Sequence, residues 1–177
     1  MSNTKEEQKI LNQHIINLQS SDETKVLQSL AWVKNDGKAE VIPHLIELLM
    51  VTPSDLVREE VSSMLKTLKD TSSLPYIIEA LKSPATQSIR GFLVSTIWES
   101  GFNAEEHLDF LVKLAIQSDY LTVLEVVTVI ENLEAFYPED EIQDMMYDID
   151  DFINENPEDP KIDILWSLKE VLEERKD

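Results

Sequence analysis

Three histidines and one dense acidic run are the residues of this chain whose types could do chemistry. His14, His44 and His107 could each ligate a metal or move a proton. None of them has a second histidine three or four residues away, which is the spacing at which a helix holds zinc. We therefore interpret them as surface or half-buried helix residues. The chain has no cysteine, so disulfides, thiol catalysis and cysteine-ligated zinc are excluded.

Carboxylates crowd the segment YPEDEIQDMMYDIDDF, where Asp144, Asp148 and Asp151 share one helical face at positions i, i+4 and i+7. Such a face could attract a divalent cation. A calcium loop, however, needs a glycine at its sharp turn and a bidentate glutamate at its twelfth position, and the segment has neither. We interpret it as a solvated acidic face and predict no bound metal and no cofactor.

Sequence motifs for catalysis are missing from the chain. It has no glycine-rich phosphate loop and no G-x-S-x-G turn. Paired carboxylates are expected by chance in a sequence with 35 Asp and Glu residues, so they do not indicate an acid-base pair. We predict no catalytic residues and a protein that is not an enzyme.

The charge is strongly negative and unevenly distributed. Fifteen Lys and Arg stand against 35 Asp and Glu, for a net charge of -20. Residues 114–160 contain 14 Asp and Glu and no Lys or Arg. This field repels nucleic-acid phosphates and anionic lipids and attracts positively charged surfaces. The sequence therefore predicts a protein partner with a basic surface, and neither a nucleic acid nor a membrane.

Targeting and membrane signals are also missing from the sequence. The segment MSNTKEEQKILNQHIINLQ mixes charges and amides with its apolar residues, unlike a secretion signal. The strongest apolar run, residues 41–51, is interrupted by His44 and Glu47 and is shorter than the roughly 20 residues of a membrane span. We expect a cytoplasmic protein.

Helices must position all of these side chains. Apolar residues recur three or four positions apart through the whole sequence, and only 3 glycines and 7 prolines interrupt it, so an all-α fold is predicted. Gly37 and Gly101 follow helical patterns and are predicted to end helices in the left-handed conformation. The predicted helices span residues 4–19, 22–35, 38–51, 54–69, 72–82, 85–100, 103–118, 120–136, 139–154 and 160–175.

An internal repeat groups these helices into pairs. VIPHLIELL (41–49) matches SLPYIIEAL (73–81) at a separation of 32 residues, and the same separation continues into the following helices. Flanking segments repeat the apolar stripe at spacings of 31 to 34 residues. We predict one domain over residues 1–177, made of five helix pairs that share a continuous core. The predicted pairs span residues 4–37, 38–70, 71–101, 102–137 and 138–177.

The two central pairs resemble the HEAT-repeat family. They carry its early proline in the first helix (Pro43, Pro75) and its arginine near the start of the second (Arg58, Arg90), and the first of them also has the turn aspartate, Asp55. Position 87 of the third pair is Gln instead of that aspartate, and the other three pairs share only the period and the apolar stripe. An armadillo-like or other α-solenoid class therefore stays open for those three pairs.

The HEAT resemblance implies a right-handed α-α superhelix whose second helices line a concave binding face. It further implies that Arg58 and Arg90 form ion pairs between neighbouring repeats. The prolines and Asp55 are structural positions in this interpretation.

An apolar anchor site is predicted on the second helix of the third pair. Val94 and Trp98 align with Ser62 and Lys66, which we expect to be exposed in the second pair. With Gly91 they could form a docking surface, since aromatic anchors contribute much of the binding energy of interfaces. The alternative is that Trp98 packs on the fourth pair.

The other two tryptophans, Trp32 and Trp166, lie in second helices near the two ends of the chain and are expected to cap the core. The predicted partner-binding residues combine the apolar anchor with acidic positions of the C-terminal half. They are Gly91, Val94, Trp98, Glu125, Asp144, Asp148 and Asp151.

These observations predict a non-enzymatic scaffold or adaptor that binds a basic protein on a concave, acidic face. One alternative is an acidic immunity or inhibitor protein directed against a basic toxin or nuclease. Another is a DNA glycosylase with a HEAT-like fold, although the acidic balance opposes the basic DNA-holding face of that family.

Overall fold

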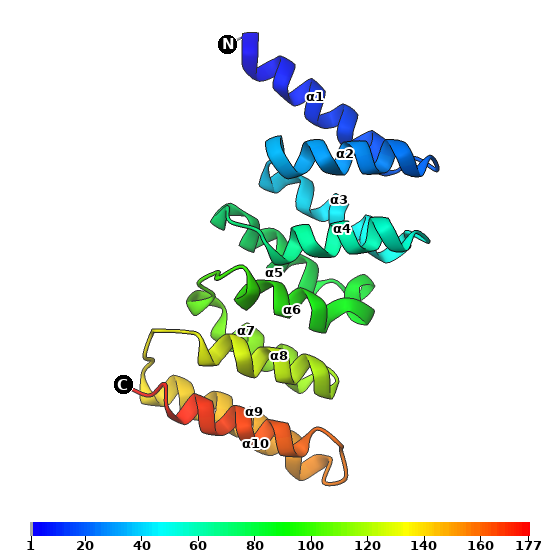
Figure 1. Cartoon of the computed structure of the whole chain (residues 1–177). Coiled ribbons are helices and arrows are strands. Elements are labelled where there is room, and N and C mark those ends of the chain that lie inside the picture. Colours follow the sequence, from blue (N-terminus) through cyan, green and yellow to red (C-terminus); the bar gives the residue numbers. More distant parts are fainter. Residues whose placement is uncertain (1) are drawn as a thin grey trace. The chain divides into compact units, whose positions relative to one another are not determined.

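The computed structural model describes residues 2–177, with side chains from residue 5 onward, and its described part is all-helical (Figure 1). Every predicted helix is present, with most ends displaced by a few residues. The described helices are α1 (Ser2–Leu18), α2 (Glu23–Asp36), α3 (Ile42–Val51), α4 (Asp55–Lys66), α5 (Leu74–Lys82), α6 (Arg90–Glu99), α7 (Leu108–Ile116), α8 (Tyr120–Glu131), α9 (Glu139–Glu155) and α10 (Ile162–Glu173).

Local sequence explains where these helices begin. Pro43 and Pro75 occupy the first turns of α3 and α5, where a missing backbone N–H costs nothing. The Ser54 hydroxyl accepts from the backbone N–H of Val57 at 3.3 Å and so caps α4. Asp55 follows as the first residue of α4, where a negative charge is favoured by the helix dipole.

The two predicted glycine stops differ in the structure. Gly101 adopts a φ of 68° after α6, as predicted, and its N–H donates to the Trp98 carbonyl at 3.0 Å. Gly37 has a φ of -68°, so the prediction of a left-handed residue is wrong there. Glycine is required at this position for space, because a Cβ atom would lie 2.3 Å from the Val33 carbonyl oxygen.

The helices form two compact units, one up to Ser88 and the other from Ile89 to Asp177. The boundary lies in the 3-10 segment Pro84–Ile89, inside the third predicted pair, so α5 belongs to unit 1 and α6 to unit 2.

Each unit has two layers of helices. In unit 1, α3 contacts both α1 and α5, while α2 contacts α4. In unit 2, α6, α8 and α10 lie side by side, and α7 and α9 form the layer behind them (Figure 1). Within unit 2, the second helices of the predicted pairs (α6, α8, α10) therefore form one layer and the first helices (α7, α9) form the other. The buried side chains between the layers include Leu93, Ile97, Val126, Ile130, Leu165 and Leu168.

Arg58 bonds within its own helix pair, whereas the prediction was an ion pair between repeats; none is present among the described side chains. Its guanidinium donates to the carbonyl oxygens of Leu49 (3.2 Å) and Thr52 (2.7 Å) at the end of α3. A cation is favoured there because the last carbonyls of a helix lack intrahelical partners. Arg90 is the first residue of α6, and its buried Nε has no hydrogen-bond partner.

The histidines are half-buried, as predicted. The ring of His14 stacks on Trp32 with 4.3 Å between ring centroids, so Trp32 packs at the α1–α2 end of unit 1. Across residues 2–177, no helix combines the length and the apolar character that crossing a bilayer requires.

Candidate binding surface

Val94 is buried and Gly91 is half-buried against α8, so the prediction that Gly91 and Val94 form an exposed anchor with Trp98 is wrong. Val94 is fully buried. A Cβ atom at Gly91 would meet the Thr122 hydroxyl oxygen of α8 at 3.4 Å. Helix α6 is apolar around much of its circumference because α8 covers the side that the sequence comparison treated as exposed.

Trp98 and Glu125, both predicted binding residues, meet on this layer. The Trp98 indole Nε1 donates to Glu125 Oε2 at 2.8 Å, which joins α6 to α8. Trp98 nevertheless stays 38% exposed. The side chain thus packs on the fourth pair and also offers part of its ring to solvent, so features of both interpretations are present.

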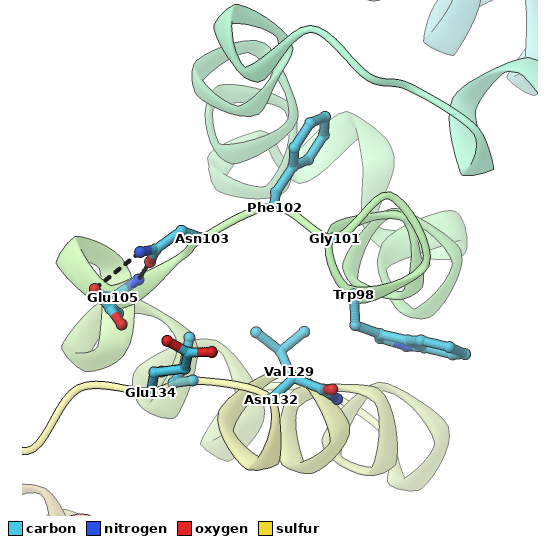
Figure 2. Close-up of a pocket in the computed structure, with 9 residues that line it drawn as sticks. Trp98, Gly101, Phe102, Asn103, Glu105, Val129, Asn132 and Glu134 are labelled. Carbon is cyan, nitrogen blue, oxygen red and sulfur yellow. Dashed lines mark hydrogen bonds between the residues drawn. The ribbon is translucent and has the colours of Figure 1, made fainter.

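A hollow lies beside Trp98, between the ends of α6 and α8 (Figure 2). Glu105 organises it: one carboxylate oxygen accepts from the Asn103 side-chain amide (2.9 Å) and the other from the backbone N–H of Ala135 (3.0 Å). The exposed Glu134 carboxylate and Val129 also line the hollow. Figure 2 shows the Trp98 ring pointing away from this space. The arrangement can receive a cationic group next to a small apolar surface.

Apolar side chains are exposed further along the same layer. Leu121 and Leu124 of α8 are 67% and 40% exposed, and Trp166 of α10 is 48% exposed. Helices α8 and α10 have equal length and run in the same direction in Figure 1, and Leu124 and Trp166 are each the fifth residue of their helix. These side chains therefore lie in the N-terminal halves of two neighbouring helices.

Trp166 does not cap the core, contrary to the sequence interpretation. The buried residues of α10 include Leu165, Leu168 and Leu172, at positions i, i+3 and i+7. Trp166 follows the first of them, about 100° around the helix, and so lies beside this stripe. The spacing of the leucines in α10 already indicated that Trp166 lies outside the buried stripe.

Unit 2 carries most of the negative charge, with 6 Lys and Arg against 23 Asp and Glu, or a net charge of -17. Only Lys113 among its six basic residues is exposed, and its Nζ lies 2.7 Å from Asp109. Lys169 and Lys176 pair with Asp150 (2.5 Å) and Glu173 (2.8 Å). The charge that this unit presents to solvent is therefore almost entirely carboxylate.

The predicted acidic residues of α9 form a second surface, separate from Trp98 and Glu125. Asp144, Asp148 and Asp151 are exposed on α9, which lies in the layer with α7. The Asp109 carboxylate raises the pKa of Lys113 through a hydrogen bond and its charge, and Asp148 adds to the effect. The seven predicted binding residues thus do not make one site. Among the described side chains, no three His, Asp or Glu are grouped as a metal site requires.

A scan against protein-family models and searches of the curated proteins and of the solved structures gave no match. The function of this chain is therefore inferred from its own residues.

Proposed function

We propose that the chain is a protein-binding scaffold or adaptor that accepts a basic partner on the α6, α8 and α10 layer of unit 2. One observation carries this proposal: exposed apolar side chains on that layer (Trp98, Leu121, Leu124 and Trp166) stand in a unit with a net charge of -17.

The negative charge and the exposed apolar side chains contribute differently to binding. Carboxylates steer a basic partner toward the unit and disfavour acidic ones, because complementary charge mainly raises association rate and specificity. Exposed aromatic and aliphatic side chains supply affinity where they become desolvated under the partner. The basic residues Lys113, Lys169 and Lys176 each pair with a nearby carboxylate. These pairs therefore leave most carboxylates of the unit available to a basic partner.

Affinity capture of a native partner tests this proposal. The captured amount is compared between salt concentrations and between charge variants of the chain. The test variant replaces Glu125, Glu131 and Glu170 of the layer with Gln. The control variant makes the same change at Glu40, Glu47 and Glu59, which are exposed in unit 1. We expect the test variant, and an increase from about 50 to 500 mM salt, each to reduce capture several-fold, because screening weakens exposed charges.

The control should capture as the unchanged protein does. Equal capture by the test variant and the unchanged protein at low salt would contradict the proposal.

We also propose that the ten helices continue through both units as one right-handed superhelix of five HEAT-like pairs. The support is the 32-residue match, which links residues 55–65 of unit 1 to residues 87–97 across the boundary. Small-angle X-ray scattering tests it. A stack of five pairs is elongated, so its radius of gyration should exceed the roughly 16 Å expected for a compact domain of this length.

A further inference from the structure

A groove between α9 and α10 lies apart from the Trp98–Glu125 contact. It has an apolar part formed by Met146 and Trp166 and an acidic rim. The rim and the remaining wall are made by Lys169, Glu170, Glu173 and Glu174.

Trp166 is held in place inside this groove. The Lys169 Nζ lies 4.7 Å from the centroid of the Trp166 ring and bonds the Asp150 carboxylate of α9 at 2.5 Å. The Lys169 side chain is only 12% exposed, so this contact is sheltered from water. An anchor fixed before binding loses less conformational entropy when a ligand arrives. The groove is therefore preorganised for an apolar side chain.

The rim determines the charge of the ligand. Glu170 of α10 and Glu174, which directly follows this helix, are exposed one helical turn apart, while Glu173 pairs with Lys176. A nucleic acid would place phosphates against these carboxylates, and a second copy of this chain would bring another charge of -20. A basic polypeptide suits the rim.

Resting on the proposed function, we propose that this groove binds a basic amphipathic helix of the partner protein. An apolar side chain of that helix packs on Trp166 and Met146, and its lysines or arginines pair with Glu170 and Glu174. Residues one turn apart on the bound helix match the spacing of the two carboxylates.

A peptide titration of the full chain tests the groove. The probe is a synthetic 16-residue helix of Leu and Lys with all leucines on one face, and the comparison peptide has the same composition in scrambled order. Binding at about 50 mM salt is followed by NMR of the three tryptophan indole N–H signals. We expect the Trp166 signal to shift most, and the scrambled peptide to bind at least about tenfold more weakly, because only the amphipathic helix presents one apolar face.

Three variants locate the binding. Trp166→Ala should weaken binding of the amphipathic peptide by about tenfold or more. Glu170→Gln with Glu174→Gln keeps the apolar part of the groove and tests the rim without core disruption; we expect a loss of several-fold that disappears in high salt. Glu47→Gln with Glu59→Gln in unit 1 is the matched control and should leave affinity unchanged.

The outcomes separate this inference from the proposed function. If the peptide binds but moves the Trp98 signal, and both groove variants bind normally, the groove is wrong and the adaptor function stands. Equal binding of the scrambled peptide, or no binding of either peptide, also overturns the groove. The adaptor function depends instead on capture by the variant at Glu125, Glu131 and Glu170.

Discussion

At the scale of single residues, the buried Lys161 connects two helices of unit 2 through hydrogen bonds. Its side chain is 6% exposed, and its Nζ donates to the carbonyl oxygens of Ile116 (2.6 Å) and Ser118 (2.7 Å) at the end of α7. The same Nζ lies 4.3 Å from the centroid of the Phe152 ring. Burial lowers the pKa of Lys161, while the charges of Asp159 and Asp119 oppose that change. The lysine ties α7 to the start of α10.

Replacing Lys161 with Met should lower the free energy of unfolding by about 1–3 kcal/mol, because two sheltered carbonyls lose their charged donor. Denaturant unfolding with a constant m-value measures the change. Lys113→Met is the matched control, since it removes an exposed lysine from the same unit, and it should have a much smaller effect. Equal effects of the two changes would show that the buried contacts of Lys161 add nothing.

Tyr137 lies between α8 and α9 and bonds Glu105, which lies between α6 and α7. This contact makes the stability of the fold decrease at alkaline pH. The Tyr137 hydroxyl donates to the Glu105 carbonyl at 3.1 Å. Burial, with a smaller contribution from the Glu105 charge, raises the pKa of Tyr137 above its ordinary value of 10.0, and Arg175 partly opposes this. Above pH 10 the unfolded chain therefore loses this proton before the folded chain does, so the contribution of Tyr137 to stability falls as pH rises.

The Tyr137→Phe variant should lack this alkaline decrease. We expect the difference in unfolding free energy between the unchanged protein and the variant to be constant from pH 7 to 9 and to shrink between pH 10 and 11. Taking the difference cancels the titration of every other group that the substitution leaves undisturbed. A difference that stayed constant to pH 11 would contradict the raised pKa.

At the scale of elements, packing of α6 on α8 explains why Val94 of the predicted anchor is buried while Trp98 stays partly exposed. Gly91 faces Thr122 of α8, where a Cβ atom would make an ordinary contact, and Val94 is fully buried. Trp98, one turn later, reaches past this contact to bond Glu125. Besides Trp98, the exposed apolar side chains of this layer therefore include Leu121 and Leu124 of α8 and Trp166 of α10.

Two substitutions at Gly91 measure this close approach. Gly91→Ala should raise stability by about 0.5–1 kcal/mol, since alanine favours the helix and its Cβ atom meets Thr122 at an ordinary contact distance. Gly91→Leu should lower stability by about 1–3 kcal/mol through overpacking against α8. Thermal unfolding of both variants gives the comparison. A leucine tolerated without cost would mean that position 91 is open, as the sequence interpretation held.

At the scale of the whole molecule, the charge is concentrated in unit 2, which holds -17 of the net -20. Self-repulsion of this kind opposes the compact state and is reduced by salt. Under the proposed function, we expect a basic partner to approach this unit.

Sodium chloride between about 20 and 500 mM should therefore raise the unfolding temperature. Changing Asp144, Asp148 and Asp151 to Asn should raise it at low salt and reduce the further gain on adding salt, because part of the repulsion is already removed. Circular dichroism melting curves at both salt concentrations check this. A lower unfolding temperature at high salt would show that ion pairs such as Lys169–Asp150 outweigh the repulsion.

The helices of residues 2–177 and many of their ends could be predicted from local sequence. Spacing of apolar residues, Pro43 and Pro75 in first turns, Ser54 before α4 and Gly101 after α6 all act through neighbours within a few positions along the chain. Interactions at that range are readable from local sequence. Charge also needs no fold, so the acidic character of residues 114–160 was available directly.

Which side chains of those helices face solvent could not be predicted in the same way. Val94 is buried and Trp166 exposed, the reverse of what the sequence suggested, because exposure depends on which helix packs alongside. Lys161 finds its carbonyl partners more than 40 residues away along the chain, and Trp98 finds Glu125 on another helix. No spacing rule relates such partners; they meet only when the layers of unit 2 assemble.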